Sequence, residues 1–224
     1  MPETLHQAVI FDLDGTLLDT LEDLADAVNT ALANHGWPAH PLDAYRQFVG
    51  NGVTTLIRRA MPEEHRLEDN LVAGIVAEMR EIYSHGWANK TRPYPGIDQL
   101  LTALQDNGVP MTVLSNKPHD ATAAMVEHFF PANLFRLVMG ARPDKPSKPD
   151  PTTALETAGF LGLPPTALLF LGDSDVDIRT AIAAGMTPLG AAWGFRGPEE
   201  LRTAGARAVL RTPEELPGWL DAGC

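Results

Sequence analysis

The stretch Ala8-Val9-Ile10-Phe11-Asp12-Leu13-Asp14-Gly15-Thr16 starts as a short apolar run and ends abruptly in two aspartates followed by Gly-Thr. A buried strand that brings its carboxyl end to a ligand crevice has this pattern. In extended backbone, residues i and i+2 point to the same side, so Asp12 and Asp14 can address one site. Two carboxylates there repel each other unless a cation or a proton separates them. The alternative is a strand followed by an ordinary Asp14-Gly15 turn, and the rest of the chain decides between the two.

The overall composition is that of a soluble globular protein. The chain has 224 residues, of which 44% are hydrophobic and 21% charged, enough for one large domain or a domain with an insertion. No apolar run approaches the length of a membrane span, and no signal-peptide pattern opens the chain. The single cysteine, Cys224, cannot form an internal disulfide. We therefore expect a cytoplasmic protein with no membrane partner.

The charge balance is strongly acidic. The formal net charge is -12, from 29 acidic and 17 basic residues. Sequence-independent binding to nucleic acid needs a basic face, so we expect no nucleic-acid partner. Any anionic substrate needs a local positive site to overcome the general field. A metal, a lysine or a helix N-terminus can supply it, and lysine is scarce, occurring only at positions 90, 117, 145 and 148.

Between the first strand and residue 89 the sequence predicts only helices. Apolar residues recur at three- and four-residue steps from Leu21 to Leu32, and Thr20 with Asp23 resembles an N-terminal cap. The Pro- and Gly-rich segment 91–96 ends the helical run and resembles a linker. Further helices are predicted over 42–48, 53–60 and 63–84, with the turn Gly50-Asn51-Gly52 after the first of them.

Beyond residue 96 predicted helices alternate with strands, which indicates a parallel sheet covered on both faces. We therefore predict an α/β fold with a doubly wound, Rossmann-like parallel sheet core over 1–17 and 90–224, and an inserted all-helical cap over 18–89. The insertion follows the carboxyl end of the first strand, where open α/β sheets bind ligands. Strands are predicted near 109–114, 135–139, 167–171, 187–192 and 208–210. Helices are predicted over 96–107, 120–130 and 151–159, from after Asp177 through Ala184, and from Thr212 onward.

The first strand and the strands near 109–114 and 167–171 are each followed by polar residues suited to binding a cation and a phosphate group. Converging carboxylates bind a hard cation such as Mg²⁺ through oxygen, and a hydroxyl with a lysine holds phosphate oxygens. Ser115 is expected where a strand turns into a helix, so that backbone N–H groups there also face an anion. In chain order the residues are Asp12, Asp14, Ser115, Asn116, Lys148, Asp173 and Asp177.

The chain resembles the haloacid dehalogenase-like hydrolase superfamily, most of whose members are Mg²⁺-dependent phosphatases. Its four ordered motifs are Asp12-Leu13-Asp14-Gly15-Thr16, Ser115, Lys148, and Gly172-Asp173-Ser174 through Asp177. The resemblance covers essentially the whole chain, because the helical insertion falls where one cap class of the superfamily has it. The family pattern Lys-Pro-x-Pro fits Lys148 and not Lys145, which we interpret as a solvated neighbour.

The resemblance implies a catalytic role for four residues. Asp12 is the nucleophile that forms an aspartyl-phosphate, and Asp14 is the acid that protonates the leaving oxygen and then the base that activates water. Ser115 donates to a phosphate oxygen. Lys148 neutralises charge on Asp12 and on the phosphoryl oxygens.

The resemblance also implies a Mg²⁺ cofactor and a set of contacts to the substrate. Asp12, the main-chain carbonyl of Asp14 and Asp173 bind the cation, and Asp177 either binds it or orients another ligand. The residues expected to contact substrate are Thr16, Asn116, Gly50, Asn51 and Gly52.

The second aspartate of the first motif and the lysines of the cap distinguish the reactions found in the superfamily. Dehalogenases and phosphonoacetaldehyde hydrolases lack the second aspartate, whereas Asp14 is present, and residues 18–89 contain no lysine for a Schiff base. Residues 11–29 and 48–53 most resemble phosphoglycolate phosphatases, which implies 2-phosphoglycolate as substrate. Arg58 or Arg59 is then a candidate partner of the substrate carboxylate, and an exposed helix face is the alternative.

Other functions stay open. Within the superfamily they are a broad sugar-phosphate phosphatase, a pyrophosphatase or a mutase of the β-phosphoglucomutase type. A signalling receiver domain also combines a phosphorylated Asp, Mg²⁺, a Ser/Thr and a Lys, but it has no helical cap and its phospho-Asp persists. The seven histidines do not cluster at metal-ligand spacing, so zinc is not expected. The expected partner is a small phosphorylated metabolite, bound by a monomer or a homodimer.

Overall fold

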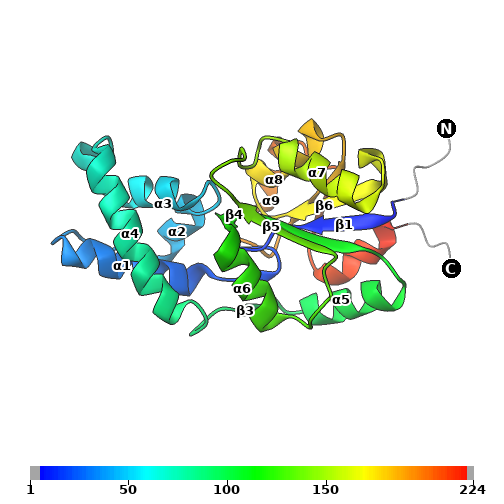
Figure 1. Ribbon diagram of the computed structural model, residues 1–224, viewed down its shortest axis with the longest axis horizontal. Coiled ribbons are helices and arrows are strands. Elements are labelled where there is room, and N and C mark those ends of the chain that lie inside the picture. The colour runs from blue at the N-terminus through cyan, green and yellow to red at the C-terminus, as the bar shows by residue number, and fades with distance from the viewer. Residues whose placement is uncertain (1–5, 221–224) are drawn as a thin grey trace. The chain divides into compact units, whose positions relative to one another are not determined.

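The computed structural model describes residues 6–220 (Figure 1). The chain divides into two compact units, Met1–Leu18 with Pro93–Cys224, and Asp19–Arg92. The chain passes between them in two short strands, β2 (Leu18–Asp19) and β3 (Arg92–Pro93), which pair with each other. Cys224 lies outside the described residues.

The first unit is built on a six-stranded parallel sheet. Its first strand, β1 (Ala8–Phe11), lies in the middle, with Val9 opposite Met111 on one side and Leu169 on the other. Every residue of β1 is fully buried, as expected for a strand covered on both faces. The spatial order is β5-β4-β1-β6-β7-β8. The other strands are β4 (Met111–Pro118), β5 (Leu137–Ala141), β6 (Leu168–Gly172), β7 (Thr187–Ala191) and β8 (Ala208–Leu210).

The winding of the sheet changes direction between β1 and β6. After β1 the chain adds β4 and β5 on one side, then returns to build β6, β7 and β8 on the other. In open α/β sheets the carboxyl ends of the two strands at such a switch point border the ligand crevice. Here those ends lead directly into Asp12 and Asp173, so the predicted doubly wound sheet is confirmed and its crevice lies at the acidic motifs.

Helices cover both faces of this sheet. Figure 1 shows α5 and α6 on one face and α7, α8 and α9 on the other. Two differences from the sequence prediction concern the end of the chain. The short helix α9 was not predicted, and the segment after Thr212 is a 3₁₀-helix, in which Pro217 removes a backbone N–H. The elements are α5 (Ile97–Asp106), α6 (His119–Phe129), α7 (Thr152–Leu161), η2 (Pro165–Ala167), α8 (Asp175–Ala183), α9 (Pro198–Thr203) and η3 (Pro213–Trp219).

The second unit is helical, with α1 (Leu21–Asn34) packed against α4 (Asp69–Gly86). The prediction of one helix over 63–84 is wrong. The segment is divided into η1 (Glu63–His65) and α4, and Leu67 between them is 88% exposed, so it does not belong to the apolar stripe that suggested a continuous helix. The predicted helices at 42–48 and 53–60 are confirmed as α2 (Leu42–Phe48) and α3 (Val53–Ala60).

Asp23 has a different task from the one predicted. Thr20 is the N-cap residue of α1, as predicted, but its side chain makes no capping hydrogen bond. The buried Asp23 carboxylate instead accepts the backbone N–H groups of Lys90 at 3.0 Å and Thr91 at 2.8 Å, and the Thr91 hydroxyl at 2.8 Å. It thereby ties the beginning of this unit to its end, because the buried charge needs these donors.

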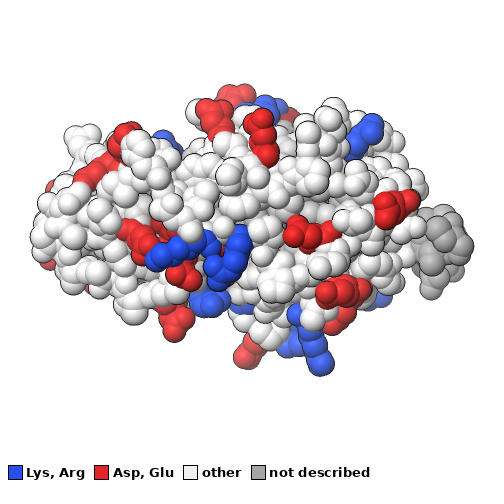
Figure 2. Space-filling model, turned by 90° about the horizontal axis from the view of Figure 1, so that it is seen from below, with Lys and Arg blue, Asp and Glu red and all other residues white. Residues whose placement is uncertain are grey.

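Charge on the surface is mixed. On the face drawn in Figure 2, acidic side chains are spread widely and basic ones lie among them. Among the described residues, no helix has both the length and the apolar character that crossing a membrane requires.

Candidate active site

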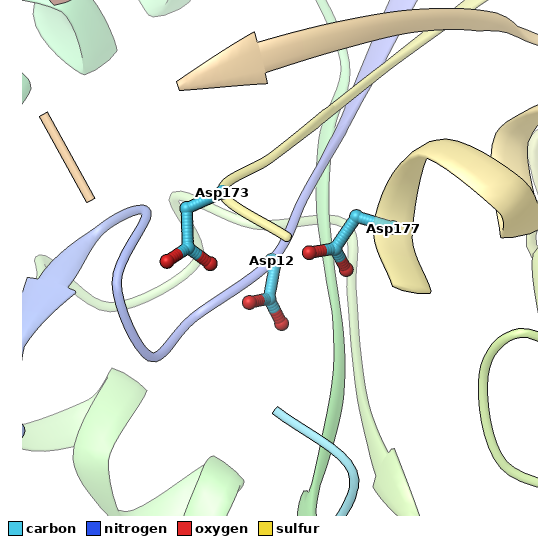
Figure 3. Close-up of side chains that lie close together, drawn as sticks. All are labelled: Asp12, Asp173 and Asp177. Carbon is cyan, nitrogen blue, oxygen red and sulfur yellow. The ribbon is translucent and has the colours of Figure 1, made fainter. Parts of the chain in front are cut away.

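Three aspartates meet at the switch point of the sheet. Asp12 follows β1, Asp173 follows β6, and Asp177 lies in the first turn of α8; all three are buried. One carboxylate oxygen from each lies within 4.8 Å of the others (Figure 3). Clustered carboxylate oxygens are the donors that hard divalent cations such as Mg²⁺ take. The structure therefore brings together three of the predicted metal-binding side chains in one place.

Two glycine positions let the loops close around Asp173. Gly15 has a φ of +90°, and a Cβ there would lie 2.3 Å from Asp173 Oδ2. A Cβ at Gly194 would lie 2.3 Å from Asp173 Cβ. The Phe195 N–H next to it donates to Asp173 Oδ2 at 2.7 Å. Gly15 and Gly194 have no side chain, so the backbone of both loops can approach the Asp173 carboxylate closely.

Lys148 is the cation inside the cluster. Its Nζ donates to Asp12 Oδ1 at 2.7 Å, to Asp177 Oδ1 at 2.6 Å and to the Leu114 carbonyl at 2.9 Å. Burial lowers the pKa of Lys148, but the two carboxylates raise it by more, so the pKa lies above its ordinary value and the side chain stays charged. Lys145 instead pairs with Glu156. The geometry thus places Lys148, and not Lys145, beside Asp12.

The aspartates carry more negative charge than one lysine offsets. Burial, opposed by Lys148 and reinforced by Asp177 and Asp14, raises the pKa of Asp12 from 3.8 to about 7. Burial and the charges of Asp12 and Asp177 likewise raise the pKa of Asp173, against the opposing effect of the Phe195 N–H and Arg196. A carboxylate cluster with this affinity for protons also has affinity for a metal cation.

Asp177 has both oxygens in use. Its Oδ1 accepts from Lys148, while Oδ2 accepts the Ser174 N–H at 3.1 Å and the Ser174 hydroxyl at 2.6 Å. The Ser174 contacts form a capping box at the start of α8. Asp177 therefore links the helix start to the buried lysine.

The carboxyl end of β4 differs from the prediction. Ser115 was expected where a strand turns into a helix, but the chain stays extended to Pro118 and α6 begins only at His119. The pairing of β4 with β5 is irregular between Leu114 and Pro118, which lets the chain continue past the regular ladder. No helix N-terminus therefore begins at Ser115.

Asn116 fixes the loop that carries Lys148. Its Nδ2 donates to the Lys148 carbonyl at 3.0 Å, and its Oδ1 accepts the Lys148 N–H at 2.9 Å. This pair of hydrogen bonds joins β4 to the lysine loop, and both residues are buried. These two hydrogen bonds link Asn116 to Lys148, the residue that contacts Asp12.

Lys117 is the site residue that the sequence reasoning missed. Its Nζ lies 3.2 Å and 3.3 Å from the two carboxylate oxygens of Asp14, and the Lys117 N–H donates to Ser115 Oγ at 3.1 Å. Residues two apart in an extended strand share a side. The position of Ser115 therefore indicates Lys117 only if the strand is known to continue past Ser115.

The other residues predicted to contact the substrate are Thr16 and the turn Gly50-Asn51-Gly52. The Thr16 side chain is fully buried, and its Oγ1 has no hydrogen-bond partner among the described residues. Gly50, Asn51 and Gly52 belong to the second unit, between α2 and α3, and both glycines have positive φ, at 115° and 82°. That conformation favours glycine and accounts for the sequence of the turn.

The two candidate arginines have partners inside their own unit. Arg58 pairs with Asp69 at 2.5 Å and donates to the Arg66 carbonyl. Arg59 donates to the carbonyls of Gln47 and Phe48, each at 3.0 Å, at the end of α2. The predicted pairing with a substrate carboxylate stays a prediction, and these contacts give both side chains a structural task.

Comparison with known proteins points to one family. Residues 9–191 match the family model described as haloacid dehalogenase-like hydrolase. A phosphoglycolate phosphatase of Pseudomonas savastanoi pv. phaseolicola is 35% identical over 97% of this chain and 81% of that protein. A phosphoglycolate phosphatase of Pseudomonas putida is 36% identical over 98% of this chain and 82% of that protein. The solved structure of a provisionally named phosphoglycolate phosphatase from Lactobacillus delbrueckii subsp. bulgaricus has a TM-score of 0.88 and 30% identity, covering 96% of this chain and 98% of the other.

Proposed function

This chain belongs to the haloacid dehalogenase-like hydrolase family and is a phosphatase, and we propose that it hydrolyses 2-phosphoglycolate through an aspartyl-phosphate formed on Asp12. One observation carries the chemistry: the buried Asp12 carboxylate lies 2.7 Å from Lys148 Nζ, within a cluster of carboxylates able to hold a cation. The names of relatives at 35% and 36% identity support the substrate.

The reaction proceeds in two balanced steps. In the first, an oxygen of Asp12 attacks the phosphorus, the P–O bond to the substrate breaks, and the carboxyl proton of Asp14 passes to the leaving oxygen. In the second, the Asp14 carboxylate takes a proton from water as the water oxygen attacks the same phosphorus. The P–O bond to Asp12 breaks, so phosphate is released and both aspartates return to their starting states.

The donor set fits Mg²⁺. Asp12 and Asp173 offer carboxylate oxygens, and the main-chain carbonyl of Asp14 would complete the set contributed by the protein. When bound, Mg²⁺ offsets the charge of the carboxylates and of the phosphoryl oxygens. We assign Asp177 the task of orienting Lys148 and α8, because both of its oxygens already accept hydrogen bonds.

Lys148 and Ser115 act on the phosphoryl group. The Lys148 ammonium stabilises charge on the equatorial oxygens as the P–O bond breaks, and it is held in place by Asp177 and by the Leu114 carbonyl. The Ser115 hydroxyl donates to a phosphate oxygen. Asn116 fixes the lysine loop, which reaches the substrate through Lys148.

The turn Gly50-Asn51-Gly52 is proposed to contact the substrate through its backbone. The Arg59 bonds to the carbonyls of Gln47 and Phe48 hold the chain that leads into this turn. Thr16 is proposed to support the loop of Asp12 and Asp14, because its side chain is fully buried.

The test is phosphate release from 2-phosphoglycolate, measured with and without Mg²⁺ beside a panel of sugar phosphates and pyrophosphate. Asp12→Asn, which keeps the shape of the side chain, is the blank for contaminating phosphatases. We expect kcat/KM for 2-phosphoglycolate to exceed that of every panel member and to vanish in the variant. Equal, weak activity across the panel contradicts the proposed substrate. Interconversion of two phosphosugars with little free phosphate contradicts the hydrolytic reaction.

A further inference from the structure

Asp14 does not share its cationic partner with the other carboxylates of the site. Lys148 contacts Asp12 and Asp177, and the Phe195 N–H contacts Asp173. Asp14 has a different cation, Lys117, whose Nζ is nearly equidistant from the two carboxylate oxygens, at 3.2 Å and 3.3 Å.

The Lys117–Asp14 pair is almost closed to water. The Lys117 side chain is 6% exposed and that of Asp14 is 13% exposed. An exposed ion pair contributes little and leaves its partners free to move, whereas an ion pair of this burial holds both side chains strongly. Lys117 lies near the end of β4, next to Pro118, which is again in register with Ala141 of β5, so it is not in a surface loop.

The Asp14 side chain must be held in place because a cation site lies beside it. It lies two residues after Asp12, next to the cluster that fits a divalent cation. A cation there attracts every carboxylate within reach, and the attraction is strong where water is excluded. If the Asp14 carboxylate joined the cation, its oxygens would no longer be free to exchange a proton with the leaving oxygen. Lys117 provides a competing positive charge outside the cluster.

We propose that Lys117 is a positioning residue that keeps the Asp14 carboxyl group out of the cation cluster and directed to the leaving oxygen. This inference rests on the proposed function, in which Asp14 transfers a proton to that oxygen. It assigns the two buried lysines of the site different tasks, with Lys148 serving the nucleophile and Lys117 the acid.

The first test compares leaving groups in single turnovers. An alkyl phosphate needs a proton on its leaving oxygen, whereas p-nitrophenyl phosphate releases a stable anion without one. We expect Lys117→Met to slow alcohol release from the best alkyl phosphate by about 100-fold, and nitrophenol release by less than about 10-fold, since acid catalysis contributes about 10²–10⁴-fold. Lys117→Arg keeps the charge and should restore part of the alkyl rate. Lys90→Met, which removes a half-exposed lysine paired with Asp26, is the matched control.

The second test measures Mg²⁺ binding by calorimetry and does not depend on turnover. Lys117→Met should bind Mg²⁺ more tightly than the wild type, by about 3-fold or more, because Asp14 can then join the cation. The double variant with Asp14→Asn should lose this gain. If the Met variant does not fold by circular dichroism, Lys117→Gln is used in both tests, since it keeps a donor but not the charge.

The outcomes distinguish the positioning role of Lys117 from the proposed function. Equal slowing of both substrates, a change confined to KM, or unchanged Mg²⁺ affinity overturns the positioning role of Lys117. Absence of any phosphatase activity in the wild type overturns the proposed function, while the Mg²⁺ measurement still decides whether Lys117 keeps Asp14 from the cation.

Discussion

Gly15 and Gly36 share a left-handed backbone, with φ of +90° and +73°, but differ in their surroundings. A Cβ at Gly15 meets Asp173, whereas nothing lies within 4 Å of a Cβ at Gly36. We expect both alanine variants to lose about 1–2 kcal/mol of stability from backbone strain. Only Gly15→Ala should also lower kcat, by about 100-fold, because it displaces a carboxylate of the site. Denaturant unfolding and phosphate release measure the two effects, and equal kcat values in the two variants contradict the role of Gly15.

The raised pKa of Asp12 predicts how the stability of the metal-free protein depends on pH. Burial, against the opposing effect of Lys148, raises the pKa from 3.8 to about 7, so the folded state holds a proton that the unfolded state has lost over this range. This contribution to the free energy of unfolding is largest below about pH 4 and is lost as the pH rises through about 7. We expect about 2–3 kcal/mol less stability from this group at pH 8 than at pH 5.

Unfolding by urea in the presence of a chelator, at the two pH values, tests this dependence. In Asp12→Asn the difference between the two pH values should shrink by that amount, because the titrating group is absent. Added Mg²⁺ should stabilise the wild type more at pH 8 than at pH 5, since it competes with the proton. A pH dependence that is the same in both proteins contradicts the prediction.

Site residues could be predicted from the sequence where they belong to a recognisable motif. Asp12, Asp173, Asp177 and Lys148 belong to ordered motifs, and the structure brings them together. Lys117 was missed because its importance follows from the length of β4, which exceeds the prediction at its carboxyl end. Strand ends are set by pairing with distant neighbours, here an irregular ladder with β5, and such pairing leaves no local signal.

At the scale of elements, Asp23 ties α1 to the last residues of the helical unit. Asp23→Ala leaves the N–H groups of Lys90 and Thr91 without their acceptor, and we expect a loss of about 2–4 kcal/mol. Asp26→Ala is the matched control, because Asp26 is on the same helix and pairs with Lys90 Nζ in an exposed ion pair; it should lose less than about 1 kcal/mol. Chemical denaturation measures both, and equal losses contradict the assigned role of Asp23.

Most helices and strands could be predicted from the sequence, because their apolar periodicity is strong. In two of the errors the structure departs from a local sequence pattern. Leu67 fits a helical stripe but is exposed between η1 and α4, and Asp23 fits a capping pattern but bonds to Lys90 and Thr91. The Asp23 contacts reach residues far along the chain, which a local pattern does not indicate.

At the scale of the whole molecule, the net charge of -12 opposes the approach of an anionic substrate. The Debye length falls from about 30 Å at 0.01 M to about 8 Å at 0.15 M ionic strength. We therefore expect kcat/KM for 2-phosphoglycolate to rise by about 2-fold over this range at fixed Mg²⁺, as the repulsion is screened. Steady-state kinetics in KCl measures it. A fall in kcat/KM with salt contradicts the prediction and indicates that local positive charge dominates the encounter.

The central position of β1 has a consequence for synthesis on the ribosome. β1 is made before β4 and β6, the two strands with which it pairs, so it has no complete set of neighbours until the chain has reached Gly172. The helical unit is contiguous and is complete at Arg92. Domains fold as they are made, so the inserted unit is expected to fold first, while the fully apolar Ala8–Phe11 segment waits unpaired. Until its partner strands are made, this segment exposes apolar side chains that a chaperone can bind.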